Sequence, residues 1–476
     1  TGGVHLPFGL QTTTFGDMRA LTTGIVVASF ALAGCTTPAE YPVLQTGEPE
    51  LTSGSLAFLG LDGNLYALLQ DESTVRQITT DATADSLDLR YSGYAWVGEE
   101  IVFAAQLEPG RDNSSSRLSV AKPGERPREL FSQDGISPFF LYPSPDGERV
   151  GYLGGQRGEG GFVMASVNLQ TGEKTVHGKG QPFYSAWSPD GTQLLTHVGM
   201  PTGRSTGSQL TLRQSSTDGF EGGIELDLTT GRFQAPAFAP DGESIAVVLA
   251  DDEEGSGIHL LSSGGEDAGR IAPVRGSATL GWAPNGSQIA FIDGLVPAGT
   301  GLGGPLAVVG GSRRDPRLIS RLAVAFFWSP DSTKLLYFEP FALQGGSGIG
   351  YRVGVYRAFD GESQIVATIR PAPEFVQQII PFFDQYNRAY SVWAPDSRNV
   401  VLNTLAETNE RVIMLMDTET SIEGDNFRVS YTPVQRQDES AANLGIITPE
   451  GVSFRPLFYG TVPFFSLVER SFSESQ

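Results

Sequence analysis

Short apolar runs alternate with glycine- and proline-containing turns along most of the chain. The stretch 237–273 shows the pattern: an apolar run at Ser244–Leu249, an acidic loop at Ala250–Gly257, a second run at Ile258–Leu261 and a third at Arg270–Ala272. Runs of this length, bounded by turn residues, predict short β-strands. The 59 glycines and 30 prolines supply the turns, so we expect an all-β protein.

The apolar runs follow a repeated corner, best preserved at Trp187-Ser188-Pro189-Asp190-Gly191. The corner position falls at residues 98, 145, 189, 240, 284, 330 and 395, so successive steps are 47, 44, 51, 44, 46 and 65 residues. A period in the forties built from short strands predicts the blades of a β-propeller. The long last step indicates an insertion before residue 395.

The residue types of the corner predict a tight turn between two strands. Proline sets φ for a central turn position, aspartate accepts a backbone hydrogen bond, and glycine tolerates a positive φ. The five tryptophans all stand two residues before the corner position, where an inner strand can bury the ring between sheets. They are Trp96, Trp187, Trp282, Trp328 and Trp393.

These motifs resemble the PD-type WD-like repeats of TolB-type β-propellers, which also occur in the propellers of prolyl oligopeptidases. The resemblance covers roughly residues 54–460 and implies a single β-propeller. Seven units carry the corner and residues 55–79 begin one more, so we expect eight four-stranded blades, with seven as the alternative. Residues 55–79 supply three strands without an inner one. We therefore expect a C-terminal strand within Gly445–Tyr459 to close the ring against the first blade.

The region before the repeats resembles a bacterial lipoprotein signal. Met18-Arg19 precedes an apolar run that ends in Leu32-Ala33-Gly34-Cys35. We expect residues 1–17 to be an upstream segment without a folded role, 18–34 a signal peptide, and 35–53 a flexible tether. Cys35, the one cysteine, is the predicted lipidation site, and 461–476 is the predicted C-terminal tail.

Charge and composition exclude several functions. A net charge of −22 argues against nucleic acid or anionic headgroups as partners, so we expect membrane contact through the N-terminal lipid only. His177, His197 and His259 fall in strands of different predicted blades, which argues against a metal site or a catalytic triad. The GxGxxG-like stretch at residues 299–304 precedes no helix, so we expect no nucleotide, and the sequence predicts no catalytic residues and no cofactor.

The predicted loop face of the propeller and the links between its blades carry aromatic residues suited to binding. The insertion, Pro371–Tyr390, is the strongest candidate, with a short helical turn expected before Pro381 and an irregular segment after it. Its alternative role is a plug, in which Phe375, Ile379 and Ile380 fill a gap between blades. The candidate binding residues are Phe382, Phe383, Asp384, Tyr386, Arg388 and Tyr390 in the insertion, and Phe139, Phe140, Phe183, Tyr184 and Phe326 in other links.

Three hypotheses for function follow. The leading one is a noncatalytic, exported propeller, lipid-anchored to the outer face of a bacterial membrane, that binds a protein or a cell-envelope polymer. The second is an enzyme that acts on a glycan or peptide, and the third is a structural scaffold of the envelope. The fold alone does not decide among them, because propellers host many functions.

Overall fold

The computed structural model describes residues 54–466 with short gaps, and these residues belong to one compact unit, Pro42–Gln476. The gaps are 71–74, 84–87, 110–113, 157–160, 182, 200–207, 217–218, 221–222, 231–234, 251–254, 299–300, 311–312, 344–347, 406–410, 419–426, 430–432, 436–440, 444–446 and 450–453. The expected signal, Cys35, the tether and residues 467–476 lie outside the described residues. Within the described part, no helix is both long and apolar enough to span a membrane.

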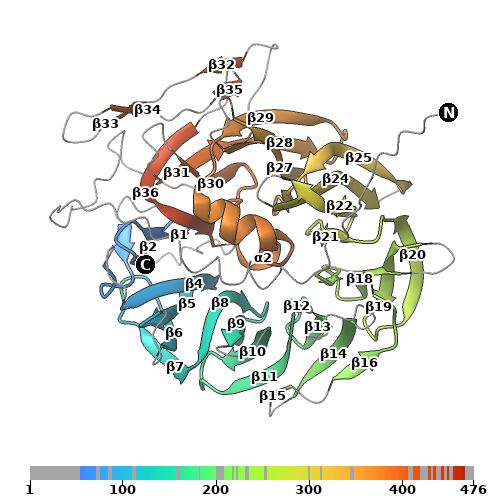
Figure 1. Cartoon of the computed structure of the whole chain (residues 1–476), viewed down its shortest axis with the longest axis horizontal. Coiled ribbons are helices and arrows are strands. Elements are labelled where there is room, and N and C mark those ends of the chain that lie inside the picture. Colours follow the sequence, from blue (N-terminus) through green and yellow to red (C-terminus); the bar gives the residue numbers. More distant parts are fainter. Residues whose placement is uncertain are drawn as a thin grey trace, which may run out of the picture. The chain divides into compact units, whose positions relative to one another are not determined.

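The described strands pair antiparallel and form seven sheets of four or more strands, arranged around a ring (Figure 1). Four of them contain β4–β7 (Leu89–Val97, Glu100–Leu107, Ser115–Ala121, Arg128–Asp134), β8–β11 (Ile136–Pro143, Arg149–Gln156, Phe162–Asn168, Lys174–Gly180), β12–β16 (Phe183–Trp187, Gln193–Gly199, Ser208–Ser216, Gly219–Phe220, Ile224–Leu226) and β17–β20 (Ala237–Phe238, Ser244–Leu249, Gly257–Ser262, Asp267–Pro273). The fifth contains β21–β25 (Ala278–Trp282, Gln288–Asp293, Val296–Ala298, Gly301–Gly310, Arg313–Ala323).

The sixth sheet contains β26–β29 (Ala325–Trp328, Lys334–Ala342, Ile349–Arg357, Ser363–Ile369), with β35 (Ile447–Pro449) and β32 (Phe427–Val429) at its edge. The seventh joins β1–β3 (Leu56–Gly60, Leu65–Leu68, Val75–Gln77) to β30, β31 and β36 (Asn399–Leu405, Arg411–Asp417, Phe454–Phe465). β33 and β34 (Pro433–Gln435, Ala441–Asn443) form a separate hairpin. The all-β prediction and the strands expected in 237–273 are confirmed.

Counted as hydrogen-bonded sheets, the propeller has seven blades, so the expectation of eight is wrong and the alternative of seven is correct. The reason is the six-stranded sheet β3-β2-β1-β36-β31-β30. The first half of β36 pairs with β31, as at Val412 and Tyr459, and its second half pairs with β1, as at Leu56 and Phe465. The first and last repeat units of the sequence therefore share one sheet.

The corners have the geometry that their residue types predict. In the corner before β27, the Ser329 hydroxyl donates to the Asp331 carboxylate at 2.7 Å, and the Ser332 amide donates to the Ser329 carbonyl at 2.8 Å. Glycine at the last corner position has φ near 73°, as in Gly191. Ser332 and Ser397 occupy the same place with φ of 65° and 56°, which is costly for a residue with a Cβ.

The tryptophans link neighbouring units of the ring. Trp187 donates its indole N–H to the Tyr142 carbonyl at 3.0 Å, 45 residues upstream. The other acceptors are Ala237 for Trp282, Gly281 for Trp328, Phe327 for Trp393 and Phe464 for Trp96, at 3.0 to 3.3 Å. Trp187 and Trp393 are among the largest fully buried side chains, so each anchors the innermost segment of its unit against the unit before it.

Candidate functional site

The insertion before residue 395 forms a helical segment at the centre of the ring (Figure 1). It consists of a π-helical turn η3 (Phe375–Ile379), a 3-10 turn η4 (Ile380–Phe382) and α2 (Phe383–Ala389). α2 contacts the inner strands β8, β12, β21 and β26 of four different sheets. The segment therefore occupies the place where the inner strands converge.

The expectation of an irregular segment after Pro381 is wrong, because α2 begins two residues later. The backbone N–H of Ile380 donates to the Phe375 carbonyl at the end of the π turn, and Pro381 lies in the first turn of the 3-10 turn that follows. The helix changes type around the proline, and the helical turns continue through residue 389.

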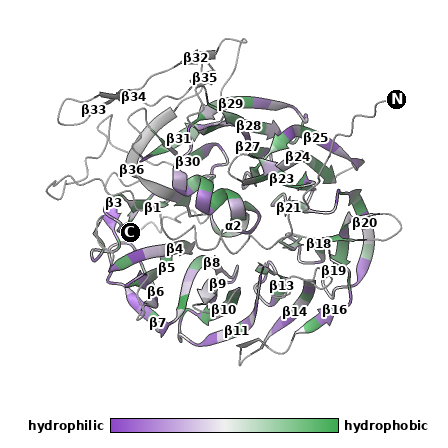
Figure 2. Ribbon diagram, viewed as in Figure 1, coloured by the Kyte–Doolittle hydropathy of each residue, from purple (hydrophilic) through white to green (hydrophobic). Residues whose placement is uncertain are grey.

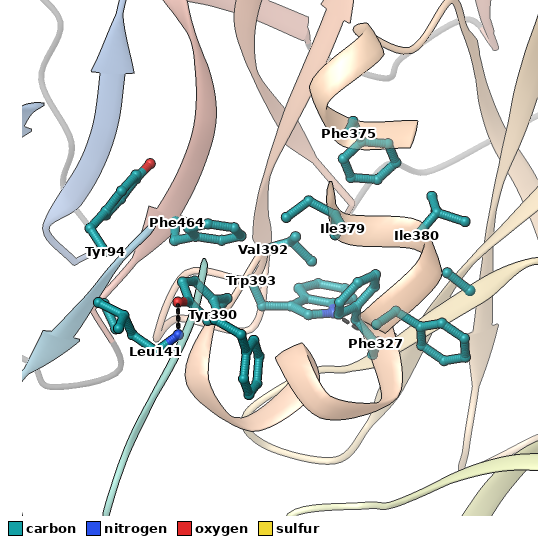
Figure 3. Packing of buried hydrophobic residues seen from close by; sticks show 14 of the residues in the cluster. Tyr94, Leu141, Phe327, Phe375, Ile379, Ile380, Tyr390, Val392, Trp393 and Phe464 are labelled. Atoms are coloured by element: carbon teal, nitrogen blue, oxygen red, sulfur yellow. Dashed lines mark hydrogen bonds between the residues drawn. The ribbon is translucent and has the colours of Figure 1, made fainter. Parts of the chain in front are cut away.

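Apolar side chains hold the segment against the ring (Figure 3). The Phe383 ring packs edge-on against Phe326, with ring centroids 5.0 Å apart, and lies 6.3 Å from the Phe327 ring. Phe375 packs against Phe338 at 5.2 Å. Phe375, Ile379 and Ile380 are buried, as the plug alternative requires.

Tyr390 ties the end of the insertion to two inner strands. Its hydroxyl accepts a hydrogen bond from the Leu141 backbone N–H on β8 at 3.1 Å, and its ring lies 4.5 Å from that of Phe464 on β36 (Figure 3). The side chain is 3% exposed. Tyr390 thus contacts two segments that lie far away in the sequence, one 249 residues before it and one in the C-terminal strand.

Asp384 is the acidic group of the segment. Burial raises its carboxyl pKa from 3.8 to about 6, and hydrogen bonds from the backbone N–H groups of Gln385 and Ala235 offset part of that rise. Burial, together with the Asp384 charge, raises the pKa of the Tyr184 hydroxyl well above 10. The Gln385 Oε1 atom is buried and has no hydrogen-bond partner among the described residues. The centre of the ring therefore holds a small polar group within an apolar surround.

Three phenylalanines from different elements form a half-buried aromatic group. The Phe139 ring lies 5.2 Å from that of Phe162 and 6.3 Å from that of Phe382. Phe139 stands where the pairing of β8 with β9 shifts register between Pro138 and Phe140. Such a bulge redirects a side chain, so Phe139 is half-buried whereas its neighbour Phe140 is 2% exposed.

The structure divides the predicted binding residues by exposure. Five are buried, at most 4% exposed: Phe140, Phe183, Phe326, Phe383 and Tyr390. Four are half-buried: Phe139, Tyr184, Phe382 and Asp384. Tyr386 and Arg388 belong to α2, and their side chains lie outside the described set.

Sequence reasoning missed Phe162, Phe464 and Gln385. A signal for Phe464 existed, because Phe464-Phe465 repeats the paired phenylalanines of two inner strands, Phe139-Phe140 and Phe326-Phe327. Phe162 opens a strand directly after a glycine-rich stretch and carries no comparable pattern. Gln385 has no apolar or charged signature that would distinguish it from a surface residue.

The three histidines of the described residues lie on separate sheets, as expected. His177 is on β11, His197 on β13 and His259 on β19. Burial, followed by the charges of Arg213 and Arg149, lowers the pKa of His177 to about 3, so this ring stays neutral. Among the described residues, no three metal-ligating side chains come together. Residues 301–304 of the GxGxxG-like stretch belong to strand β24.

No family model and no curated protein matches the sequence. Among solved structures, TolB from Acinetobacter baumannii is 13% identical over 76% of this chain and 83% of its own, with a TM-score of 0.34. The β-propeller domain of the Trilobed protease from Pyrococcus furiosus is 13% identical over 70% and 96%, with a TM-score of 0.43. Dihydro-heme d1 dehydrogenase NirN is 12% identical over 87% and 76%, with a TM-score of 0.50.

Of the three, only the likeness to NirN has a TM-score as high as 0.50, and it shows the fold alone. The most extensive of the three, to NirN, covers most of this chain, and the strand pairings above define the fold as a β-propeller. Activities and ligands differ among proteins that share a propeller, so they do not transfer at these identities.

Proposed function

We propose that the protein is a noncatalytic β-propeller that binds a protein or a cell-envelope polymer at the centre of its ring. The observation that carries this proposal is the half-buried aromatic group Phe139, Phe162 and Phe382, presented by two strands and the central helical segment. Aromatic side chains supply much of the contact energy in recognition sites. Asp384, two residues from Phe382, adds a carboxyl group to the same segment.

The buried residues of the insertion support this role by holding Phe382 in place. Phe375 packs against Phe338 on β27 and Phe383 packs against Phe326 on β26, so the segment between them, which contains Phe382, is fixed at both ends. A site whose anchors are already ordered loses little conformational entropy when it binds. One segment then serves both roles: its buried residues plug the centre of the ring, and the half-buried Phe382 belongs to the binding site.

The test compares Phe382→Ala with Phe383→Ala. The first variant should weaken capture of purified peptidoglycan sacculi or of detergent-solubilised envelope proteins by about tenfold or more, because a central aromatic anchor contributes about 2 kcal/mol. It should leave the melting temperature nearly unchanged. Phe383→Ala should instead destabilise the fold by about 3–5 kcal/mol, because it empties a buried aromatic site. Full binding by a folded Phe382→Ala variant would disprove the site.

A noncatalytic role also predicts the fate of the captured molecule. It should be recovered intact after prolonged incubation with the protein, with no change in mass. Cleavage or modification of a captured glycan or peptide would favour the enzyme hypothesis. If removal of the protein disrupted the cell envelope and the protein captured no ligand, the hypothesis of a structural scaffold would be favoured.

We further propose that the protein is exported and held on the outer face of a bacterial membrane by acyl chains on Cys35. Each buried methylene contributes about 0.8 kcal/mol, so two or more chains give lasting attachment. Cys35→Ser should move the protein from the membrane pellet to the supernatant. Retention of this variant in the pellet after a salt wash would contradict lipid anchoring.

We also propose that the C-terminal strand closes the ring. Support comes from β36, which pairs with β31 and with β1, and from Trp96, which donates to the Phe464 carbonyl. The Phe464 carbonyl accepts a hydrogen bond from the Trp96 indole, just as the Tyr142 carbonyl accepts one from the Trp187 indole.

A further inference from the structure

The Asp384 carboxyl group stands where the central helical segment meets two neighbouring sheets. Asp384 is in the first turn of α2, which contacts the inner strand β12. Its carboxyl group also accepts a hydrogen bond from the backbone N–H of Ala235, two residues before β17. Figure 2 shows hydrophobic and hydrophilic residues side by side along α2. The carboxyl group therefore lies beside the sheets that begin with β12 and β17.

The Tyr184 hydroxyl belongs to the same polar group. Tyr184 is on β12, and Ala186, two residues later, packs in one apolar cluster with Phe238 of β17. Side chains two residues apart on a strand share a face, so Tyr184 also faces the sheet of β17. Burial, and then the charge of Asp384, raises the pKa of the Tyr184 hydroxyl, so the two groups are neighbours. Both side chains are half-buried, which leaves part of each accessible to a ligand.

This polar group has hydrogen-bond acceptors but no cation to match them. Within the described part of the chain, no Lys, Arg or His side chain pairs with Asp384, and the buried Gln385 Oε1 atom has no hydrogen-bond partner. With a pKa of about 6, the Asp384 carboxyl is mostly ionised at pH 7. A carboxylate that is partly removed from water and has no cation is unfavourable in free energy, and a bound cation would relieve that cost.

We propose that Asp384 and Tyr184 bind an ammonium group of the molecule that the protein captures, an inference that rests on the proposed function. The ammonium group can donate hydrogen bonds to the carboxylate and to the Tyr184 oxygen. Phe382, which belongs to the half-buried aromatic group, is two residues from Asp384, so their Cα atoms are at most about 8 Å apart. One ligand can therefore place an apolar part on the aromatic group and its ammonium group on Asp384.

Other classes of ligand fit Asp384 and Tyr184 less well. A divalent cation needs several oxygen ligands, and no three metal-ligating side chains come together among the described residues. A guanidinium group favours both oxygens of a carboxylate, but Asp384 already accepts the N–H groups of Gln385 and Ala235. An anionic ligand would be repelled by Asp384 and by the net charge of −22.

The test changes the charge of the amino groups on the captured material. Purified peptidoglycan sacculi and detergent-solubilised envelope proteins are each offered to the full chain untreated, acetylated with acetic anhydride, or reductively dimethylated. Acetylation removes the positive charge of an amine, whereas dimethylation keeps it. Acetylation should weaken capture by at least about tenfold, and dimethylation should leave it within about threefold. Whether sacculi or envelope proteins respond in this way distinguishes a polymer from a protein as the source of the ammonium group.

Variants of the protein test the same contact from the other side. Asp384→Asn should bind untreated material at least about tenfold more weakly and should no longer distinguish it from acetylated material. Tyr184→Phe keeps the ring, removes the hydroxyl, and should weaken binding about threefold or more. The matched control is Glu129→Gln, which removes the same charge from an exposed side chain on β7 and should bind like the wild type.

The outcomes separate this proposal from the function on which it rests. Equal capture of acetylated and untreated material, or unchanged binding by Asp384→Asn, would overturn the ammonium site and leave the aromatic site standing. Equal loss of capture after dimethylation and acetylation would also overturn it, because charge would then not be recognised. Failure of the wild type to capture either material would overturn the proposed function and the ammonium site together.

Discussion

At the scale of single residues, the corners show how one side chain changes the role of a turn. Where most corners have glycine, Ser332 and Ser397 adopt the same left-handed backbone and use their hydroxyls. The Ser332 Oγ accepts from the Asn285 amide, and the Ser397 Oγ accepts from the Asp331 amide, both at 2.9 Å. The serine thus binds the previous corner at the cost of an unfavourable φ.

Substitutions at Ser397 separate these two effects. Ser397→Ala keeps the left-handed strain and loses the hydrogen bond, so it should lower the free energy of unfolding by about 1–2 kcal/mol. Ser397→Gly loses the same bond but relieves the strain, so it should cost about 1 kcal/mol less than the alanine. Urea denaturation of both variants measures the difference. A glycine variant less stable than the alanine variant would contradict this account.

Asp384 makes stability depend on pH in a defined direction. Its folded pKa of about 6 lies above the usual 3.8, so its contribution is fully present below pH 3.8 and is lost as pH rises through 6. The wild type should therefore lose up to about 3 kcal/mol relative to Asp384→Asn between pH 3.5 and 7.5. Other carboxyl groups titrate in both proteins and cancel. Parallel stability curves for the two proteins would refute the raised pKa.

At the scale of elements, the inner strands depend on the indole groups that join neighbouring units. Trp187 is fully buried, whereas Trp282 is half-buried, yet both donate to a backbone carbonyl at 3.0 Å. The two tryptophans therefore make the same hydrogen bond and differ in how deeply the indole ring is buried.

Replacing each of these tryptophans with phenylalanine should show the effect of burial. Trp187→Phe removes the indole N–H and leaves a cavity in a closed site, so we expect a loss of about 2–4 kcal/mol. Trp282→Phe should cost at least about 1 kcal/mol less, because solvent can hydrate the freed carbonyl. Thermal denaturation compares the two variants. Equal losses would mean that the hydrogen bond alone sets the cost.

The central helical segment shows why an element can be read from sequence only in part. Pro381 indicates an interruption of a regular α-helix, and the segment changes there from a π turn to a 3-10 turn and then to α2. The helix after it depends on Phe383 packing on Phe326 and Tyr390 bonding to Leu141, contacts that lie far away in sequence. Local propensity favours an irregular chain there, and tertiary packing overrides it.

At the scale of the whole molecule, β36 pairs with strands from both ends of the chain, β1 and β31. A chain that ends at residue 466 keeps β36 intact and should unfold as cooperatively as the full chain. A chain that ends at residue 453 lacks β36 and exposes the edges of β1 and β31, so it should aggregate or unfold in a broad transition. Calorimetry and light scattering distinguish the two. A sharp, unchanged transition in the shorter chain would exclude ring closure by β36.

The sequence alone determined the strands, the corners and the placement of the tryptophans. These features depend on local requirements: a proline φ, a positive φ at the last corner position, and an apolar run long enough for one strand. Such requirements act over a few residues and recur with every unit. They are therefore visible as a repeat without any knowledge of the ring.

Only the tertiary structure decided the blade count and the division of the aromatic residues. The sharing of β36 between the first and last units depends on its pairing with β1 near the other end of the described chain, as at Leu56 and Phe465. Within Phe139-Phe140 and Phe382-Phe383, one ring is buried and the other half-buried. Neighbouring side chains on a strand or a helix point in different directions, so the sequence indicates that such pairs differ. Which member faces the core is set by bulges and by the elements packed around it.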